Sequence, residues 1–276
     1  RALAPACARA RAGACSAGML FRQLMHGKSR AFSYLVASRP GSEALLIDPV
    51  LDHLELYLRL LGALDLRLAY ALDTRRHSEH SSALEALHER THCVTAMGRE
   101  SRACVVRPLA DGELIEVEGL QLEAWHTPGH SADAYCFVMD DRVFTGNTLL
   151  IRSTGRIDQG GDARAQYASL FDKLLHLPGR TLVYPGHDYH GRHVSSIAEE
   201  RRLNPRLQVS GPDEYVALMQ TQTPAHPEQV DVVDAAPLRR SGVWMQKLAA
   251  LHAARTPPNE LPTTFDTPKA RRINQR

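Results

Sequence analysis

Residues 73–80 read Asp-Thr-Arg-Arg-His-Ser-Glu-His and come directly after the apolar run at 66–72. A short apolar run bounded by polar residues is typical of a buried strand, so this polar stretch is expected where a strand ends. Four further segments follow predicted strands: His-Thr-Pro-Gly-His at 126–130, Phe-Thr-Gly-Asn at 144–147, Gly-Arg-Ile-Asp at 155–158 and Tyr-Pro-Gly-His-Asp-Tyr at 184–189. Together the five segments predict one site along an edge of the sheets.

Histidine recurs in and around these segments, at His77, His80, His126, His130, His187, His190 and His193. Clustered histidines and carboxylates are typical of metal sites, because neutral imidazole and carboxylate oxygen are good ligands. A chain with 14 histidines also gathers several of them on its surface by chance. The residues alone leave both interpretations open.

Strands and helices alternate along both halves of the chain. The apolar runs at 31–37 and 44–48 are joined by the turn Arg-Pro-Gly-Ser at 39–42, and residues 51–61 repeat apolar side chains at helical spacing. Further strands are predicted at 66–72, 93–96, 104–106, 114–117, 120–125, 134–139, 142–144 and 181–184, and further helices at 81–89, 163–177 and 194–202. This alternation predicts a layered α/β sandwich in which helices cover the sheets.

The composition is that of an ordinary globular protein, with 43% hydrophobic and 23% charged residues among 276. A net charge of +2 argues against a dedicated nucleic-acid-binding protein. No apolar run reaches the roughly 20 residues of a membrane-spanning helix, so no membrane partner is expected. Neither a G-x-S-x-G elbow nor a phosphate-binding loop occurs, so serine hydrolase and nucleotide-triphosphatase chemistry gain no support.

The five cysteines are odd in number and form no C-x-x-C motif, which favours a reducing compartment over a disulfide framework. Residues 1–18 are rich in Ala and Arg and contain no acid, which suits a mitochondrial targeting segment or a disordered extension equally. We therefore expect a protein of the cytoplasm or the mitochondrial matrix. Its expected parts are an extension at 1–19, a main domain at 20–210, a C-terminal segment at 211–255 that packs on it, and a flexible tail at 256–276.

These segments resemble those of the persulfide dioxygenases, which are related to glyoxalase II within the metallo-β-lactamase superfamily. The resemblance rests on Leu-Leu-Ile-Asp-Pro-Val at 45–50, His-Asp-Tyr-His-Gly at 187–191 and Glu-Glu-Arg-Arg-Leu-Asn-Pro-Arg-Leu at 199–207. It implies an αββα sandwich of the metallo-β-lactamase fold and a homodimer. It also implies a reaction in which glutathione persulfide, or a related thiol, and dioxygen become sulfite and glutathione at a mononuclear Fe(II).

The resemblance places the three iron ligands at Arg75, His130 and Asn147, where the family has His, His and Asp. A guanidinium keeps its proton in proteins and offers no lone pair to a metal. A neutral amide oxygen binds transition metals more weakly than a carboxylate does. In the same loop Glu79 stands where the family has Asp. We therefore expect reduced or lost dioxygenase activity, since each ligand change lowers metal affinity by at least about tenfold.

Two other arrangements remain open. In dinuclear relatives a second metal is bound at the positions of Glu79, His80, Asn147 and His187. Iron or zinc displaced from the usual position can be held by Glu79, His80 and His187, and this would support thioester hydrolysis by a metal-bound water. Alternatively, Arg75 places its cation where the metal stood and pairs with Glu79. The protein then needs no metal and is a non-catalytic relative that binds a thiol, an anion or a partner protein. The candidate metal-binding residues are His77, Glu79, His80, His130, Asn147 and His187.

For the substrate, the resemblance points to Arg156 and Tyr189 at the glutathione end of the pocket. Arg156 can equally form a structural ion pair with Asp158. The stretch Ile-Asp-Gln-Gly-Gly-Asp at 157–162 departs from the family's usual Thr-Asp-Phe-Gln, so the substrate pocket is expected to differ in shape. Asp48 resembles the family's structural Asp, which orients the metal-binding loop through hydrogen bonds.

Overall fold

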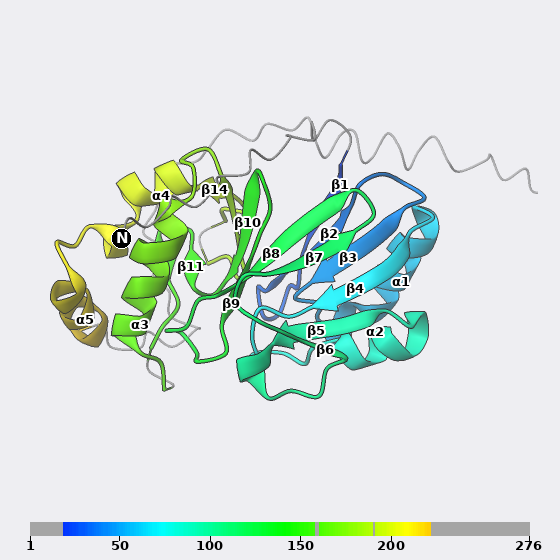
Figure 1. Cartoon of the computed structure of the whole chain (residues 1–276), viewed down its shortest axis with the longest axis horizontal. Coiled ribbons are helices and arrows are strands. Elements are labelled where there is room, and N and C mark those ends of the chain that lie inside the picture. The colour runs from blue at the N-terminus through cyan, green and yellow to red at the C-terminus, as the bar shows by residue number, and fades with distance from the viewer. Residues whose placement is uncertain (1–18, 158–159, 190, 222–276) are drawn as a thin grey trace, which may run out of the picture. The chain divides into compact units, whose positions relative to one another are not determined.

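The computed structural model describes residues 19–157, 160–189 and 191–221. In these residues two six-stranded sheets lie face to face, with helices on the outer face of each (Figure 1). The strand order is β1-β2-β3-β4-β5-β6 in the first sheet and β14-β13-β10-β9-β8-β7 in the second. The expected αββα sandwich is confirmed.

The first sheet and its helices come from the first half of the chain. Strands β1 to β3 are antiparallel neighbours, and β3 to β6 run parallel. The elements are β1 (Leu20–Met25), β2 (Phe32–Ala37), β3 (Glu43–Ile47), the 3₁₀ turn η1 (Leu51–His53), α1 (Leu54–Ala63), β4 (Arg67–Leu72), α2 (Leu84–Thr91), β5 (Val94–Gly98), η2 (Arg99–Ser101) and β6 (Arg107–Leu109).

The second sheet is antiparallel except where β10 pairs with β13. Its strands are β7 (Glu113–Val117), β8 (Leu120–His126), β9 (Tyr135–Val138), β10 (Arg142–Gly146), β13 (Leu182–Pro185) and β14 (Ser195–Ser196). A small hairpin, β11 (Leu149–Leu150) and β12 (Ser153–Thr154), follows β10. The helices are α3 (Ala163–Ala168), the π turn η3 (Ser169–Lys173), the 3₁₀ turns η4 (Leu174–His176) and η5 (Pro205–Leu207), α4 (Ile197–Leu203) and α5 (Pro212–Thr221).

Side chains on β2 alternate between two cores, as the pleat of a strand requires. Phe32, Tyr34 and Val36 pack between the two sheets, whereas Leu35 and Ala37 pack toward α1 and α2. The third core fills the space between the second sheet and α3, α4 and α5. Because both faces of β2 are buried, its sequence is a continuous apolar run rather than an alternating one.

Three predicted elements are wrong in position or form. The helix predicted at 194–202 begins only at Ile197, because Ser195 and Ser196 form strand β14. No strand forms at 104–106; the edge strand β6 lies at Arg107–Leu109 and pairs only with β5, which is why it accommodates Pro108. The helix predicted at 163–177 is α-helical only to Ala168 and continues as a π turn and a 3₁₀ turn. The sequence analysis also assigned no element to α5, whose Tyr215 hydroxyl donates to Gln166 on α3 at 2.9 Å.

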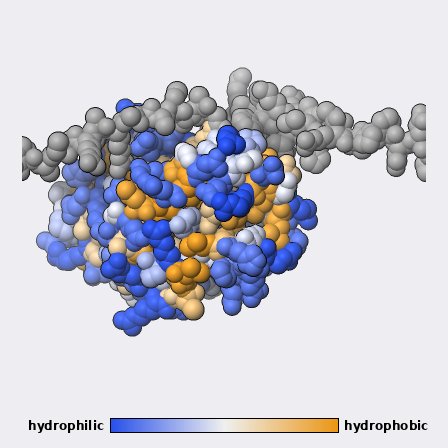
Figure 2. All heavy atoms as spheres, turned by 45° about the vertical axis from the view of Figure 1, so that its right-hand side comes forward, coloured by the Kyte–Doolittle hydropathy of each residue, from blue (hydrophilic) through white to orange (hydrophobic). Residues whose placement is uncertain are grey.

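Residues 1–18 of the expected extension at 1–19 and the tail at 256–276 lie outside the described residues, as does most of the segment at 211–255. The proposed domain boundaries therefore remain predictions. Within the described ranges, no helix is long and apolar enough to span a membrane. Figure 2 shows apolar side chains reaching the surface between hydrophilic ones. The large apolar residues that are most exposed are Met25, Leu51, Val106, Leu114, Tyr189, Val194 and Leu203.

Candidate active site

The site is built from loops that follow the carboxyl ends of four strands. The loop at 73–82 follows β4, His130 lies in the loop after β8, Asn147 follows β10, and His187 follows β13. Neighbouring strands β10 and β13 are parallel, so their ends bring Asn147 and His187 together. The parallel pairing of β10 and β13 therefore explains why these residues meet at one edge of the sheet, as the sequence predicts.

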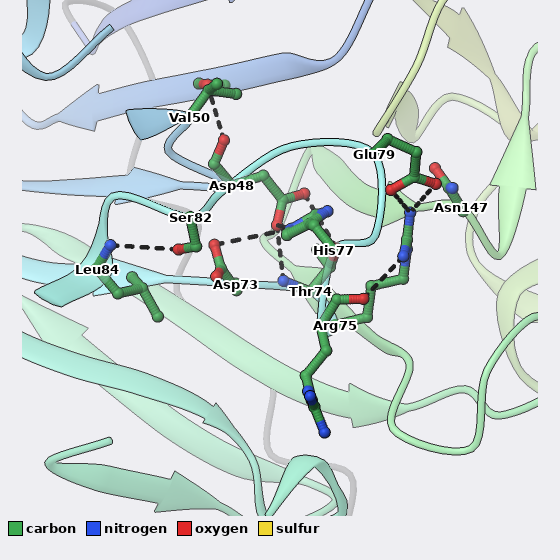
Figure 3. Close-up of polar contacts among 12 residues, drawn as sticks. Asp48, Val50, Asp73, Thr74, Arg75, His77, Glu79, Ser82, Leu84 and Asn147 are labelled. Atoms are coloured by element: carbon green, nitrogen blue, oxygen red, sulfur yellow. Dashed lines mark hydrogen bonds and ion pairs between the residues drawn. The ribbon is translucent and has the colours of Figure 1, made fainter. Parts of the chain in front are cut away.

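Asp48 fixes the start of the loop after β4. Its carboxylate accepts hydrogen bonds from the Thr74 backbone at 2.7 Å and the Thr74 hydroxyl at 3.0 Å, and lies 3.3 Å from His77 Nε2 (Figure 3). The backbone of Gly146 (φ +49°) passes close to Thr74, and a Cβ at Gly146 would lie 2.5 Å from the Thr74 hydroxyl. Asp48 therefore has the structural contacts that the resemblance implied.

Arg75 and Glu79 form a bidentate ion pair within this loop. Nη2 of Arg75 donates to the two carboxylate oxygens of Glu79 at 2.7 and 2.8 Å, and Nη1 donates to the Arg76 carbonyl at 2.8 Å. The Arg75 side chain is only 5% exposed. Burial acts to raise the pKa of Glu79, but the charge of Arg75, the neighbouring His187 and the hydrogen bonds to the carboxylate together outweigh it and lower that pKa to about 2.

Asn147 bridges two histidines. Its Oδ1 accepts from Nδ1 of His187 at 2.8 Å, and its Nδ2 lies 3.4 Å from Nε2 of His130. The other ring nitrogen of His130, Nδ1, lies 2.7 Å from the Arg156 carbonyl, which can only accept. His130 therefore carries its proton on Nδ1 and presents a lone pair to the Asn147 amide, while His187 donates from its own Nδ1.

Three histidines of the site, His80, His130 and His187, have lowered pKa values. Burial lowers the pKa of His187 to about 3, and the positive charge of Arg75 acts in the same direction. Burial and then Arg75 also lower the pKa of His130. Burial and then His77 lower the pKa of His80 to about 4. At neutral pH these imidazoles therefore add no positive charge to the site.

Several buried nitrogens near the loop have no hydrogen-bond partner within the described residues: Arg75 Nε, His77 Nδ1, both ring nitrogens of His80, and His187 Nε2. Two groups of possible metal ligands occur in the described part of the chain. His77, Glu79 and His80 offer atoms within 4.8 Å of one another, and so do Asp48, Asp73 and His77. His187 lies beside the first group, with its ring 6.4 Å from that of His80.

The residues expected at the thiol end of the pocket flank the histidines. The Tyr189 ring lies parallel to that of His187, 5.8 Å away, and is 36% exposed. Arg156 presents its carbonyl to His130, and its charge acts to lower the pKa of Tyr189, which burial raises overall. The alternative partner Asp158 lies outside the described residues. Gly155, next to Arg156, lets the backbone pass close to Asn147, since a Cβ there would lie 2.3 Å from the Asn147 carbonyl.

The sequence analysis assigned no role to Asp73, which lies directly before Thr74. Asp73 is 2% exposed, its Oδ1 accepts no hydrogen bond from the described residues, and that oxygen lies 3.8 Å from His77 Nε2. Burial raises its pKa to about 7. Asp73 lines a cavity of about 530 Å³ beside the loop at 73–82, together with Arg76, His77, Glu79, His80 and Cys104. Its place at the end of an apolar strand was the only signal available.

Two other histidines of the sequence pattern lie elsewhere. Nε2 of His126 lies 2.9 Å from the Ala132 carbonyl, and the backbone of His126 is held by Asp111. The His193 ring packs edge-on against Phe32, and its Nε2 lies 3.7 Å from Asp188. His190 is outside the described residues.

The three implied iron positions do not fit a divalent cation. A guanidinium stays protonated, so Arg75 supplies a positive charge instead of a lone pair. This guanidinium already donates two hydrogen bonds to the Glu79 carboxylate. Asn147 is neutral, and its amide is engaged by two histidines. The lone pair of His130 is directed at Asn147. The residues at these three positions therefore do not support iron chemistry there.

Comparison with known proteins agrees with the fold. A family model described as the metallo-beta-lactamase superfamily matches residues 105–187. In solved structures, the chain is similar to ETHE1 from Myxococcus xanthus, with a TM-score of 0.73 and 39% identity over 79% of this chain and 96% of that one. The protein therefore has the metallo-β-lactamase fold.

Among curated proteins, the chain is 39% identical to the human persulfide dioxygenase ETHE1, mitochondrial, over 231 residues, which cover 82% of this chain and 91% of that protein. It is 34% identical to the hydroxyacylglutathione hydrolase of Polaromonas sp. over 179 residues, or 62% of this chain and 67% of that one. The chain belongs to the persulfide dioxygenase family of the metallo-β-lactamase superfamily.

Proposed function

We propose that this protein serves sulfur metabolism by binding glutathione persulfide or a related thiol, and that its dioxygenase activity is reduced or lost. The family relationship supports the thiol ligand. The observation that carries the reduced activity is the bidentate bond of Arg75 to Glu79, at the position of the first iron ligand. A buried, paired guanidinium neither ligates a metal nor vacates its place without leaving Glu79 unpaired.

The proposed thiol pocket is bounded by His187, Tyr189 and Arg156. The rings of His187 and Tyr189 stack in parallel, with their centroids 5.8 Å apart. Arg156 supplies a cation for a carboxylate of a glutathione-like ligand, an interaction for which guanidinium geometry is well suited. We propose the cytoplasm or the mitochondrial matrix as the compartment and a homodimer as the assembly. The free state of Cys93, Cys104 and Cys136 supports a reducing compartment.

Oxygen consumption tests this function. Glutathione persulfide is added to the full chain in the presence of Fe(II), and uptake is compared with that of the double variant Arg75→His, Asn147→Asp. We expect oxygen uptake by the variant to exceed that of the wild type by at least about tenfold. The new histidine offers a lone pair to the metal and the new aspartate offers a negative charge. Equal and rapid uptake by both proteins would refute the proposed loss. No uptake by either would mean that the pocket has changed beyond its ligands.

A second candidate function is thioester hydrolysis at a displaced metal. The unpartnered nitrogens of His80 and His187, beside the Glu79 carboxylate, support this alternative. Zinc held by these three residues would supply a metal-bound water as the nucleophile. Hydrolysis of a glutathione thioester with added Zn(II), together with metal analysis of the wild type and His187→Ala, tests this alternative. Equal and negligible metal in both proteins would eliminate it.

A further inference from the structure

The amide of Asn147 fits a site without metal better than a carboxylate would. His130 must donate from Nδ1 to the Arg156 carbonyl, so its Nε2 needs a donor. The Nδ2 of Asn147 is that donor, while Oδ1 accepts from His187. A carboxylate at this position has no proton to donate and would face the lone pair of His130.

The charges lead to the same conclusion. The charges of Arg75 and Glu79 cancel in their bidentate ion pair, and the amide of Asn147 is neutral. A carboxylate at Asn147 would add a negative charge that no cation balances. A histidine at Arg75 would leave Glu79 without its partner. Each change back toward the family pattern therefore disturbs the site unless a metal ion accompanies it.

We infer that Arg75, Glu79, Asn147, His130 and His187 form a metal-free frame, in which the first and third positions have adapted to one another. The guanidinium replaces the positive charge of a metal, and the amide replaces the carboxylate that a metal would have held. The frame maintains the shape of the pocket without a bound ion. This inference concerns the protein alone and holds whichever thiol the pocket binds.

Metal content and thermal stability of the full chain test the frame. Protein from iron- and zinc-supplemented medium is analysed for metal, and Tm is measured with a chelator, with added Fe(II) under anaerobic conditions, and with added Zn(II). We expect substoichiometric metal in the wild type and the same Tm in all three conditions. Arg75→His and Asn147→Asp, each alone, should lower the Tm in chelator by about 3–8 °C.

The double variant gives the sharpest contrast. In chelator its Tm should be lower than that of the wild type and of either single variant, because Glu79 has lost its cation and a second negative charge has been added at position 147. Added Fe(II) or Zn(II) should raise it. Arg76→His is the matched control, since the neighbouring Arg76 side chain is exposed, and its Tm should not respond to metal. If the double variant is insoluble, the wild type and Asn147→Asp decide the question.

Three results would each refute the metal-free frame. The first is stoichiometric metal in the wild type, and the second is a wild-type Tm that changes with chelator or added metal. The third is a Tm in chelator that is higher for Asn147→Asp than for the wild type. Oxygen uptake and thiol binding play no part in these measurements. Failure of the metal-free frame is therefore distinguishable from failure of the proposed function.

Discussion

Oδ1 of Asp48 lies 3.3 Å from Nε2 of His77, and both side chains are almost fully buried. Burial acts to raise the pKa of Asp48, yet the hydrogen bond and charge of His77 lower it below its ordinary value. Burial likewise acts to lower the pKa of His77, and Asp48 raises it. The pair is therefore ionised together, with a second carboxylate, Asp73, 3.8 Å from the same nitrogen.

The pKa shifts of His77 and Asp73 predict that the protein becomes less stable as pH rises above neutrality. The raised pKa of His77 stabilises the fold fully below its unfolded pKa of about 6.5, and this contribution is lost as pH rises through the folded pKa. Asp73, with a pKa of about 7, favours the fold below about pH 4 and loses that contribution by about pH 7. We expect Tm to fall between pH 6 and pH 9, and to fall less in Asp73→Asn. An equal fall in the variant would contradict the assignment to Asp73.

On the acid side, the prediction concerns Glu79. Its pKa of about 2 means that the pair with Arg75 stabilises the fold above about pH 4.3, and that this contribution is lost as pH falls toward 2. Glu79→Gln should lower the Tm at pH 7, and the gap to the wild type should narrow below pH 4. Glu89→Gln, on the exposed side of α2, is the control and should change little. A gap independent of pH would show that charge is not the cause.

The Arg75–Glu79 pair was foreseeable from the sequence, because the two residues are four positions apart in one short loop. The bridge made by Asn147 was not, since it depends on the tautomers of histidines 17 positions before it and 40 positions after it. Buried strands such as β2 were predictable because both faces are apolar. The edge strand β6 was missed because its pairing with β5, rather than its own residues, defines it.

A buried network around Glu200 holds the hairpin between Asn147 and Arg156. Glu200 is fully buried and accepts from the Arg152 backbone at 2.9 Å, from the Arg152 guanidinium, and from Asn204 at 2.9 Å. Glu200→Gln removes the buried half of this ion pair, leaves the Arg152 guanidinium with only the more exposed Glu199, and should lower the free energy of unfolding by about 3–5 kcal/mol.

Glu199→Gln is the matched control, because Glu199 pairs with the same guanidinium but is 37% exposed. Its loss should cost about 0–1 kcal/mol. Urea denaturation of the two variants measures the difference. Similar values for both would show that burial of Glu200 does not set the strength of the network.

Gly129, within the segment at 126–130, lets the backbone of this loop contact the backbone of α3 at Gln166. Its φ is +144°, and a Cβ there would lie 2.3 Å from Cα of Gln166 on α3. Gly129→Ala should therefore lower the free energy of unfolding by about 2 kcal/mol or more, through strain and overpacking. Gly27→Ala is the control, since a Cβ at Gly27 meets no atom of the described residues within 4 Å. A stable Gly129→Ala protein would mean that α3 can move away from this loop.

The proposed thiol pocket predicts a specific loss of affinity. If Arg156 binds a carboxylate of glutathione, Arg156→Ala removes a hydrogen bond to a charged group, which is typically about 1.5–3 kcal/mol, or roughly 10–100-fold in Kd. Isothermal titration with reduced glutathione measures this without requiring turnover. Arg164→Ala removes an exposed arginine that pairs with Asp213 on the surface, and its Kd should match the wild type. If both variants bind like the wild type while keeping their Tm, the carboxylate lies elsewhere, and Arg156 serves mainly through its carbonyl, which fixes the tautomer of His130.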